Sequence, residues 1–111
     1  MLKSTNDNTN VWKKDDRGWW YVKKDSSYAK SELLNIDSKE YWFNWEGYMA
    51  TGWLQDKSGD WFYFNSDGSM RKSAWLEYKS AWYYLSSSGI MLKSARTPDG
   101  YNINREGIWV N

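Results

Sequence analysis

Aromatic side chains are abundant in this chain and recur at regular intervals, so they are the first candidates for ligand binding. The sequence contains ten Trp, nine Tyr and three Phe, and tryptophans recur in pairs such as Trp53 with Trp61 and Trp75 with Trp82. The face of an aromatic ring attracts a cation, and its carbon surface covers apolar groups. Ring faces suit sugars as well, so the residue types alone leave a cationic and a carbohydrate ligand open.

The residues that usually support catalysis are scarce. The chain has no His and no Cys, which removes the commonest general base, thiolate metal sites and disulfides. The 14 acidic residues lie in turns or exposed strand positions of a repeated pattern, without an enzyme motif around them. Asp15–Asp16 and Asp56 with Asp60 lack the spacing of a calcium loop, so we interpret them as turn formers. We therefore expect no enzyme, no metal and no cofactor.

Charge and hydropathy exclude two further classes of partner. The 15 basic and 14 acidic residues leave a net charge of +1. Binding of single-stranded nucleic acid through stacked aromatics normally needs a basic groove, so we expect no nucleic-acid partner. The sequence contains neither a secretory signal pattern nor an apolar run long enough to span a membrane. We expect no direct membrane insertion, and an extracellular protein whose export signal is absent from this sequence.

A repeat with a period of 21 residues organises the chain. Gly47, Gly68 and Gly89 follow this period, and a methionine stands two residues after each. The predicted units span residues 11–31, 32–51, 52–73, 74–94 and 95–111, within one domain covering 11–111. Met-Leu-Lys-Ser occurs at 1–4 and again at 91–94. We therefore hypothesise that Met1 is a repeat methionine or a start placed at a repeat boundary, with residues 1–10 as a linker or the end of a preceding repeat.

Each unit is expected to form two strands and two turns. In the third unit, residues 53–56 and 60–64 favour strands, and Gly68 ends a turn that requires a positive φ. Both faces of the second strand are aromatic, so neighbouring hairpins must cover one another. The predicted fold is an all-β solenoid of stacked β-hairpins. The residues expected in its core are Phe62, Phe64, Leu76, Tyr83 and Leu85.

The motif in the third unit resembles a known family. Gly52-Trp53, Gly59, Trp61-Phe62-Tyr63, Gly68 and Met70 follow the pattern G-W-x5-G-x-W-[FY]-Y-x4-G-x-M, which is similar to the choline-binding, or cell-wall-binding, repeat. The resemblance covers roughly residues 11–110 and extends to the C-terminal modules of choline-dependent autolysins and phage lysins. It implies binding sites between successive hairpins, no catalysis, and a location on the wall or surface of Gram-positive bacteria.

The resemblance also implies which residues form aromatic cages for choline. The first cage comprises Trp53 and Trp61 closed by Tyr84, with Met70 or Met91 as an apolar contact; the second comprises Trp75 and Trp82 closed by Tyr101; the third comprises Trp12 with Trp19 or Trp20, closed by Trp42. The unit at 32–51 carries Leu33 and Glu40 where the first, third and fourth units carry Trp, so no site is expected there.

The leading hypothesis is therefore a non-catalytic module that binds choline on teichoic or lipoteichoic acid. Related repeats bind glucan or other carbohydrate, which gives the first alternative. Paired tryptophans suit a closed cage better than a flat platform, which favours choline. A structural or dimerisation module is the second alternative, and a homodimer is left open.

Overall fold

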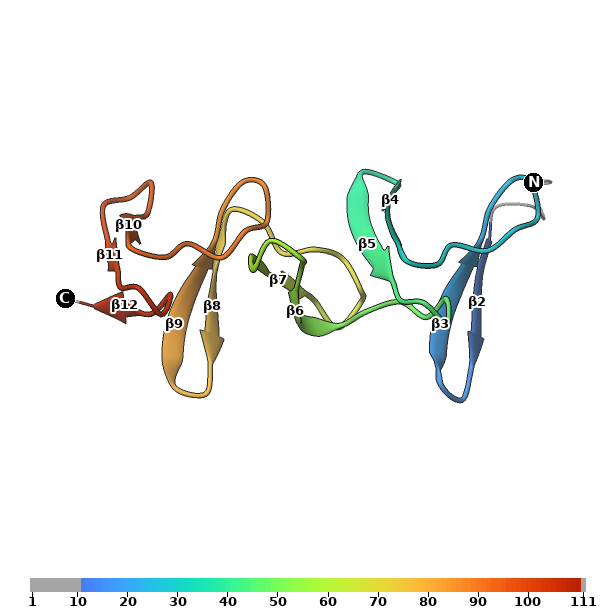
Figure 1. The fold of residues 1–111 in the computed structure, drawn as a ribbon, viewed down its shortest axis with the longest axis horizontal. Helices are drawn as coiled ribbons and strands as arrows, with labels where there is room; N and C mark the ends of the chain where they lie inside the picture. Colours follow the sequence, from blue (N-terminus) through green and yellow to red (C-terminus); the bar gives the residue numbers. More distant parts are fainter. Residues whose placement is uncertain (1–10, 111) are drawn as a thin grey trace. The chain divides into compact units, whose positions relative to one another are not determined.

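The structure is a computed structural model that describes residues 11–110, so the expectations for residues 1–10 lie outside the described residues. Its described strands are numbered β2 to β12 (Figure 1). The chain divides into two compact units, unit 1 (Met1–Thr51) and unit 2 (Gly52–Asn111), which are described separately. Among residues 11–110 there is no helix of the length and apolarity needed to cross a membrane.

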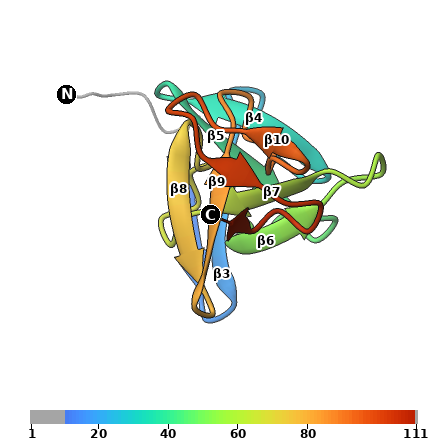
Figure 2. The ribbon, with the colours of Figure 1, turned by 90° about the vertical axis from the view of Figure 1, so that its left-hand side faces the viewer.

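All the described strands pair as antiparallel hairpins or a short meander. In unit 1, β2 (Val11–Asp15) pairs with β3 (Gly18–Val22), and β4 (Glu32–Ile36) pairs with β5 (Lys39–Phe43). In unit 2, β6 (Gly52–Gln55) pairs with β7 (Trp61–Phe64), and β8 (Ala74–Tyr78) with β9 (Ala81–Leu85). The strands β10 (Ala95–Arg96), β11 (Asn102–Ile103) and β12 (Trp109–Val110) form a three-stranded sheet, and β12 contacts β9. Figure 2 shows the paired strands β8 and β9 side by side.

Two hairpins close through two-residue turns with left-handed backbone. Lys79 and Ser80 join β8 to β9 with φ values of 49° and 68°, and Asp37 and Ser38 join β4 to β5 with 53° and 70°. Positive φ at both central residues matches the twist of the flanking strands, which is why short hairpins use such turns. The turns hold the register in which Trp75 lies opposite Tyr84.

A second kind of turn follows each full hairpin and returns the chain to it. In unit 2, the N–H of Gly68 donates to the carbonyl of Asn65 (2.8 Å), and Gly89 donates to Ser86 (2.9 Å). Both glycines have φ near 90°, a region that side chains disfavour. The chain then makes one bridge to the second strand, and each bridge positions a side chain two residues after the turn. The bridges join Val22 to Tyr28, Phe43 to Met49, Phe64 to Met70 and Leu85 to Met91.

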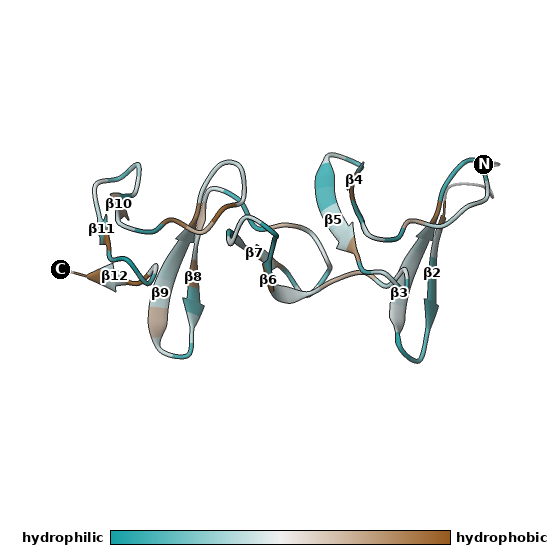
Figure 3. Cartoon of the chain, viewed as in Figure 1, coloured by the Kyte–Doolittle hydropathy of each residue, from teal (hydrophilic) through white to brown (hydrophobic). Residues whose placement is uncertain are grey.

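Within each unit, these returning segments also join neighbouring hairpins. The N–H of Met91 donates to the carbonyl of Trp61 (2.8 Å), and the N–H of Met49 donates to the carbonyl of Trp19 (2.7 Å). Three of the second strands each bury one large side chain fully: Phe43 in unit 1, and Phe64 and Leu85 in unit 2. Most of β3 and β9 is pale in Figure 3, because Trp and Tyr have intermediate hydropathy. The expected all-β fold of stacked hairpins is confirmed.

Candidate aromatic cages

The first cage lies in unit 2, between the hairpin β6–β7 and the hairpin that follows it. The rings of Trp53 and Trp61 meet edge to face, with centroids 6.2 Å apart and planes at 88°. Tyr83 of β9 contacts Trp53 at 5.3 Å and 71°, and Tyr78 contacts it at 5.9 Å and 83°. These four rings line a cavity of about 390 Å³ together with Met91 and Glu106. Rings from two hairpins therefore line this open cavity on several sides.

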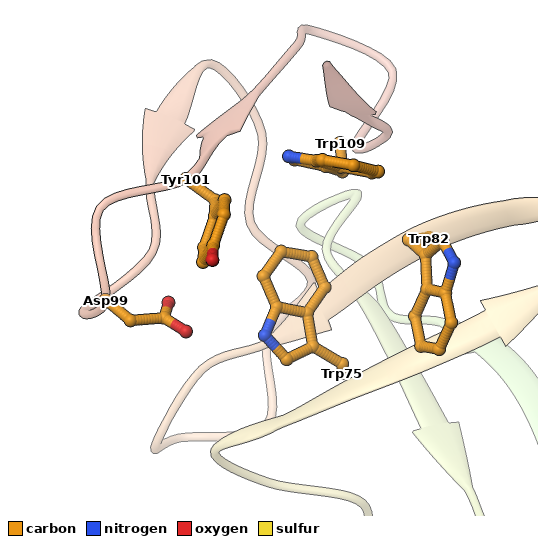
Figure 4. A pocket seen from close by; sticks show the side chains of 5 residues that line it. All are labelled: Trp75, Trp82, Asp99, Tyr101 and Trp109. Carbon is orange, nitrogen blue, oxygen red and sulfur yellow. The ribbon is translucent and has the colours of Figure 1, made fainter. Parts of the chain in front are cut away.

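The second cage lies between the hairpin β8–β9 and the three-stranded sheet. Trp75 and Trp82 are 6.4 Å apart at 81°, and Tyr101 contacts Trp75 at 5.8 Å and 78°. Trp109 of β12 contacts Tyr101 at 6.2 Å and 82°. Figure 4 shows these four rings around one space, a cavity of about 360 Å³, with Asp99 at its edge beside Tyr101.

A third group of rings in unit 1 repeats the geometry of the first cage. Trp12 and Trp19 are 6.3 Å apart at 86°, and Tyr41 contacts Trp12 at 5.0 Å and 68°. The Met49 N–H donates to the carbonyl of Trp19, as the Met91 N–H donates to the carbonyl of Trp61. Met49 also packs against the same core cluster as Trp12 and Tyr41. The equivalent residues are therefore arranged alike in the two units.

Comparisons with known proteins agree with this geometry. A family model described as a choline-binding repeat matches residues 54–95. The structure of the choline-binding domain of Spr1274 from Streptococcus pneumoniae is 36% identical, with a TM-score of 0.66, over 75% of this chain and 96% of that one. The chain belongs to the choline-binding repeat family.

Two other relatives are longer than this chain. Choline binding protein F from Streptococcus pneumoniae is 34% identical with a TM-score of 0.78, over 90% of this chain and 33% of that protein. A lysin of Pneumococcus phage Dp-1 is 37% identical over 52 residues, which make up 44% of this chain and 18% of the lysin. This choline-binding repeat chain thus spans a third or less of these relatives.

Two of the expected cage residues lie one position away from the ring that meets the Trp pair. Tyr84 is buried and packs on Trp75 of its own hairpin at 5.2 Å, whereas Tyr83, which we expected in the core, contacts Trp53. Trp42 lies opposite Leu33 in its own hairpin, and Tyr41 contacts Trp12. Successive strand residues point to opposite faces, so a shift of one residue moves a side chain to the other face.

The remaining expected residues divide between cages and packing. Met91 lines the first cage, whereas Met70 is buried beneath the next turn, where a Cβ at Gly89 would lie 2.3 Å from its Sδ. Trp19 lies with Trp12, while Trp20 lines a different cavity. The structure brings Trp53, Trp61 and Met91 together, and Trp75, Trp82 and Tyr101 together, as expected.

A consistent repeat register would have identified the rings that sequence reasoning missed. Tyr83 and Tyr101 each stand two residues before a buried strand residue, Leu85 or Ile103. Trp109 stands six residues after Ile103, as Met91 stands six residues after Leu85, so Trp109 occupies the methionine position. Asp99 and Glu106 lie in turns, and no signal in the sequence indicated that these turns reach the cavities.

Two of the residues that line the cavity containing Trp20 contact a cation of the protein itself, Arg17. The cavity is lined by Asp15, Trp20, Tyr28, Glu46 and Tyr48. The Arg17 guanidinium lies 4.8 Å from the centre of the Tyr48 ring and donates to both oxygens of Glu46 at 2.8 Å. The Tyr48 hydroxyl donates to Asp15 Oδ2 (2.7 Å), which lowers the pKa of Asp15 and raises that of Tyr48. We assign no ligand to this cavity.

Proposed function

We propose that this chain is a non-catalytic module that binds choline carried by teichoic or lipoteichoic acid in the Gram-positive cell wall. The observation that carries the proposal is that one cavity is lined by Trp53, Trp61 and Tyr83, whose rings come from two hairpins and cross at steep angles. A quaternary ammonium has no N–H to donate. Ring faces attract its charge and cover its methyl groups.

The angles between the rings favour a cation over a sugar. A sugar stacks on a platform that offers one open face, whereas the planes of Trp53 and Trp61 cross at 88° and those of Trp75 and Trp82 at 81°. Crossed rings present their faces from different sides, as a compact cation with methyl groups all around requires. We therefore propose two choline cages in unit 2 and a third at Trp12, Trp19 and Tyr41 in unit 1.

Family membership supports a wall-associated role. Choline binding protein F, which this chain resembles, has been crystallised with a peptidoglycan analogue, a tetrasaccharide-pentapeptide. In this proposal, the aromatic cages alone are sufficient for the repeats to bind a polymer that carries choline. We place the module outside the cell on this basis, at the wall or surface.

Affinity chromatography tests the proposed ligand class. The chain should be retained on a matrix that carries quaternary ammonium groups, and free choline should elute it. Trp61→Ala combined with Trp82→Ala and Trp19→Ala, which together alter all three proposed cages, should pass through the matrix while keeping the β-sheet circular dichroism of the parent. Elution by a neutral glucan oligosaccharide, with choline ineffective, would replace choline by carbohydrate as the ligand.

A further inference from the structure

Each of the two cavities described in unit 2 has one carboxylate among its lining residues. Glu106 lines the cage of Trp53 and Trp61, and Asp99 lines the cage of Trp75 and Trp82. Both acids directly precede a glycine of positive φ that ends a turn, Gly107 or Gly100. Neither acid belongs to the hairpin that supplies the Trp pair of its cavity.

Packing of its turn holds Glu106 at the first cage. A Cβ at Gly107 would lie 2.6 Å from Met91 Cε, so this turn lies directly on the methionine that lines the cage. The Glu106 N–H donates to Asn104 Oδ1 (2.9 Å), and this hydrogen bond within the turn stabilises its conformation. The Glu106 side chain is 63% exposed, and Arg105 pairs with it at 3.6 Å while being 87% exposed. Such an exposed ion pair contributes little and leaves the carboxylate available to another cation.

A different network holds Asp99 at the second cage. The Thr97 hydroxyl is buried and donates to Asp99 Oδ1 (2.5 Å). The N–H of Tyr101 donates to the same hydroxyl oxygen (3.0 Å). The carboxylate is thus fixed relative to the Tyr101 ring, at the edge of the cavity (Figure 4).

Unit 1 provides an internal contrast. Glu46 occupies the turn position of Glu106, because Asn44 to Gly47 repeats the turn from Asn104 to Gly107. Glu46 is bonded through both oxygens to Arg17, which also lies on the Tyr48 ring. A ring face with a carboxylate beside it therefore already binds a cation in this chain, namely an arginine of its own.

We infer that Glu106 and Asp99 are specificity-determining residues, which favour a cation over a neutral ligand of the same shape in the two cages of unit 2. The inference rests on the proposed function. A carboxylate cannot accept a hydrogen bond from a quaternary ammonium, so its effect is the attraction between charges at the mouth of the cavity. The ring faces attract the cation and cover its methyl groups, and the carboxylates add an attraction that a neutral ligand of the same shape lacks.

The test compares choline with 3,3-dimethylbutan-1-ol, a neutral alcohol in which carbon replaces the ammonium nitrogen. Binding to each cage is followed by NMR through the indole N–H signals of its own tryptophans. Glu106→Gln should weaken choline about twofold to fivefold at Trp53 and Trp61, and leave the neutral alcohol unchanged there. Asp99→Asn should do the same at Trp75 and Trp82.

Asp25→Asn is the matched control. It removes the same charge at the equivalent position of another turn, where Asp25 accepts bonds from Ser27 and lines none of the three cavities described above. It should leave both ligands unchanged, and added salt should reduce the difference between Glu106→Gln and the parent.

Three results would overturn the inference. They are an unchanged choline affinity in both variants, an equal loss of choline and neutral alcohol, and an equal effect of Asp25→Asn. Failure of the proposed function looks different, because the indole signals of the unmodified chain would then not respond to choline at all.

Discussion

Tyr83 and Tyr84 are neighbours in β9 with opposite roles. Tyr83 offers its ring to Trp53, while Tyr84 is buried against Trp75. Tyr83→Ala should weaken choline at the first cage by about five- to thirtyfold, and Tyr83→Phe should retain it, because the ring face matters and the hydroxyl does not. Calorimetric titration measures both variants. Equal losses would mean that the hydroxyl is a hydrogen-bond partner, as in a sugar site.

Tyr84→Ala should lower the free energy of unfolding, whereas Tyr83→Ala lowers the affinity for choline. Removing a buried ring leaves a cavity, which costs about 3 kcal/mol or more of the free energy of unfolding. Urea denaturation measures this cost, and Tyr83→Ala, at a more exposed position, should cost less. A stability loss that is larger for Tyr83→Ala would contradict the orientation of β9.

The bond between Tyr48 and Asp15 predicts a pH dependence in unit 1. The pKa of Asp15 lies below its ordinary value of 3.8, chiefly because the Tyr48 hydroxyl donates to it. The stabilisation is therefore complete above that ordinary value and is lost as the pH falls through the lowered pKa. In Tyr48→Phe the pKa of Asp15 should rise, as measured by NMR titration of the carboxyl carbon. An unchanged pKa would show that the backbone bonds alone hold it low.

At the scale of the hairpin and its turns, two structural features favour glycine at position 89. Its φ is 89°, and a Cβ there would overlap Met70 Sδ, whereas Gly100 has a φ of 92° and nothing within 4 Å of an added Cβ. Gly100→Ala should cost about 1–2 kcal/mol of unfolding free energy from backbone strain alone. Gly89→Ala should cost more, because Met70 must also move. Equal costs in urea denaturation would refute the packing of Met70 beneath this turn.

The strands and turns could be predicted from the sequence, but the orientation of one hairpin on the next could not. The strands expected at 53–56 and 60–64 are β6 and β7, since local alternation and turn glycines define them. Whether Tyr83 or Tyr84 meets Trp53 depends on which face of β9 turns toward the preceding hairpin. Both faces of β9 are aromatic, so hydropathy does not distinguish them. The sequence did not identify Trp109 as a cage residue, because Trp109 stands at the position that holds a methionine in the three preceding units.

At the scale of the whole molecule, several weak cages must act together. A cation over desolvated rings gains about 2 kcal/mol, and immobilising a small ligand opposes this gain, so one cage should bind choline with a dissociation constant of roughly 1 mM. A polymer that presents choline repeatedly can fill both cages of unit 2, and linked binding raises avidity by roughly 10² to 10⁴.

The homodimer left open by the sequence stays a prediction.

Binding to purified teichoic acid tests this avidity. The chain should bind the polymer at least about a hundredfold more tightly than free choline, and millimolar choline should release it. Trp82→Ala removes one cage of unit 2 and should reduce polymer binding far more than it reduces the affinity of the other cage for free choline. Polymer binding no tighter than that of free choline would mean that the cages act singly.

The crossed rings of each Trp pair are proposed to bind choline. NMR titration of the unmodified chain with choline, observing the indole N–H signals, tests this proposal most directly. We predict that the signals of Trp53 and Trp61 shift together with a dissociation constant of roughly 1 mM, and that Trp61→Ala abolishes the shift of Trp53 while Trp75 and Trp82 still respond. Indole signals that ignore choline at tens of millimolar, and shift instead with a glucan oligosaccharide, would contradict the account.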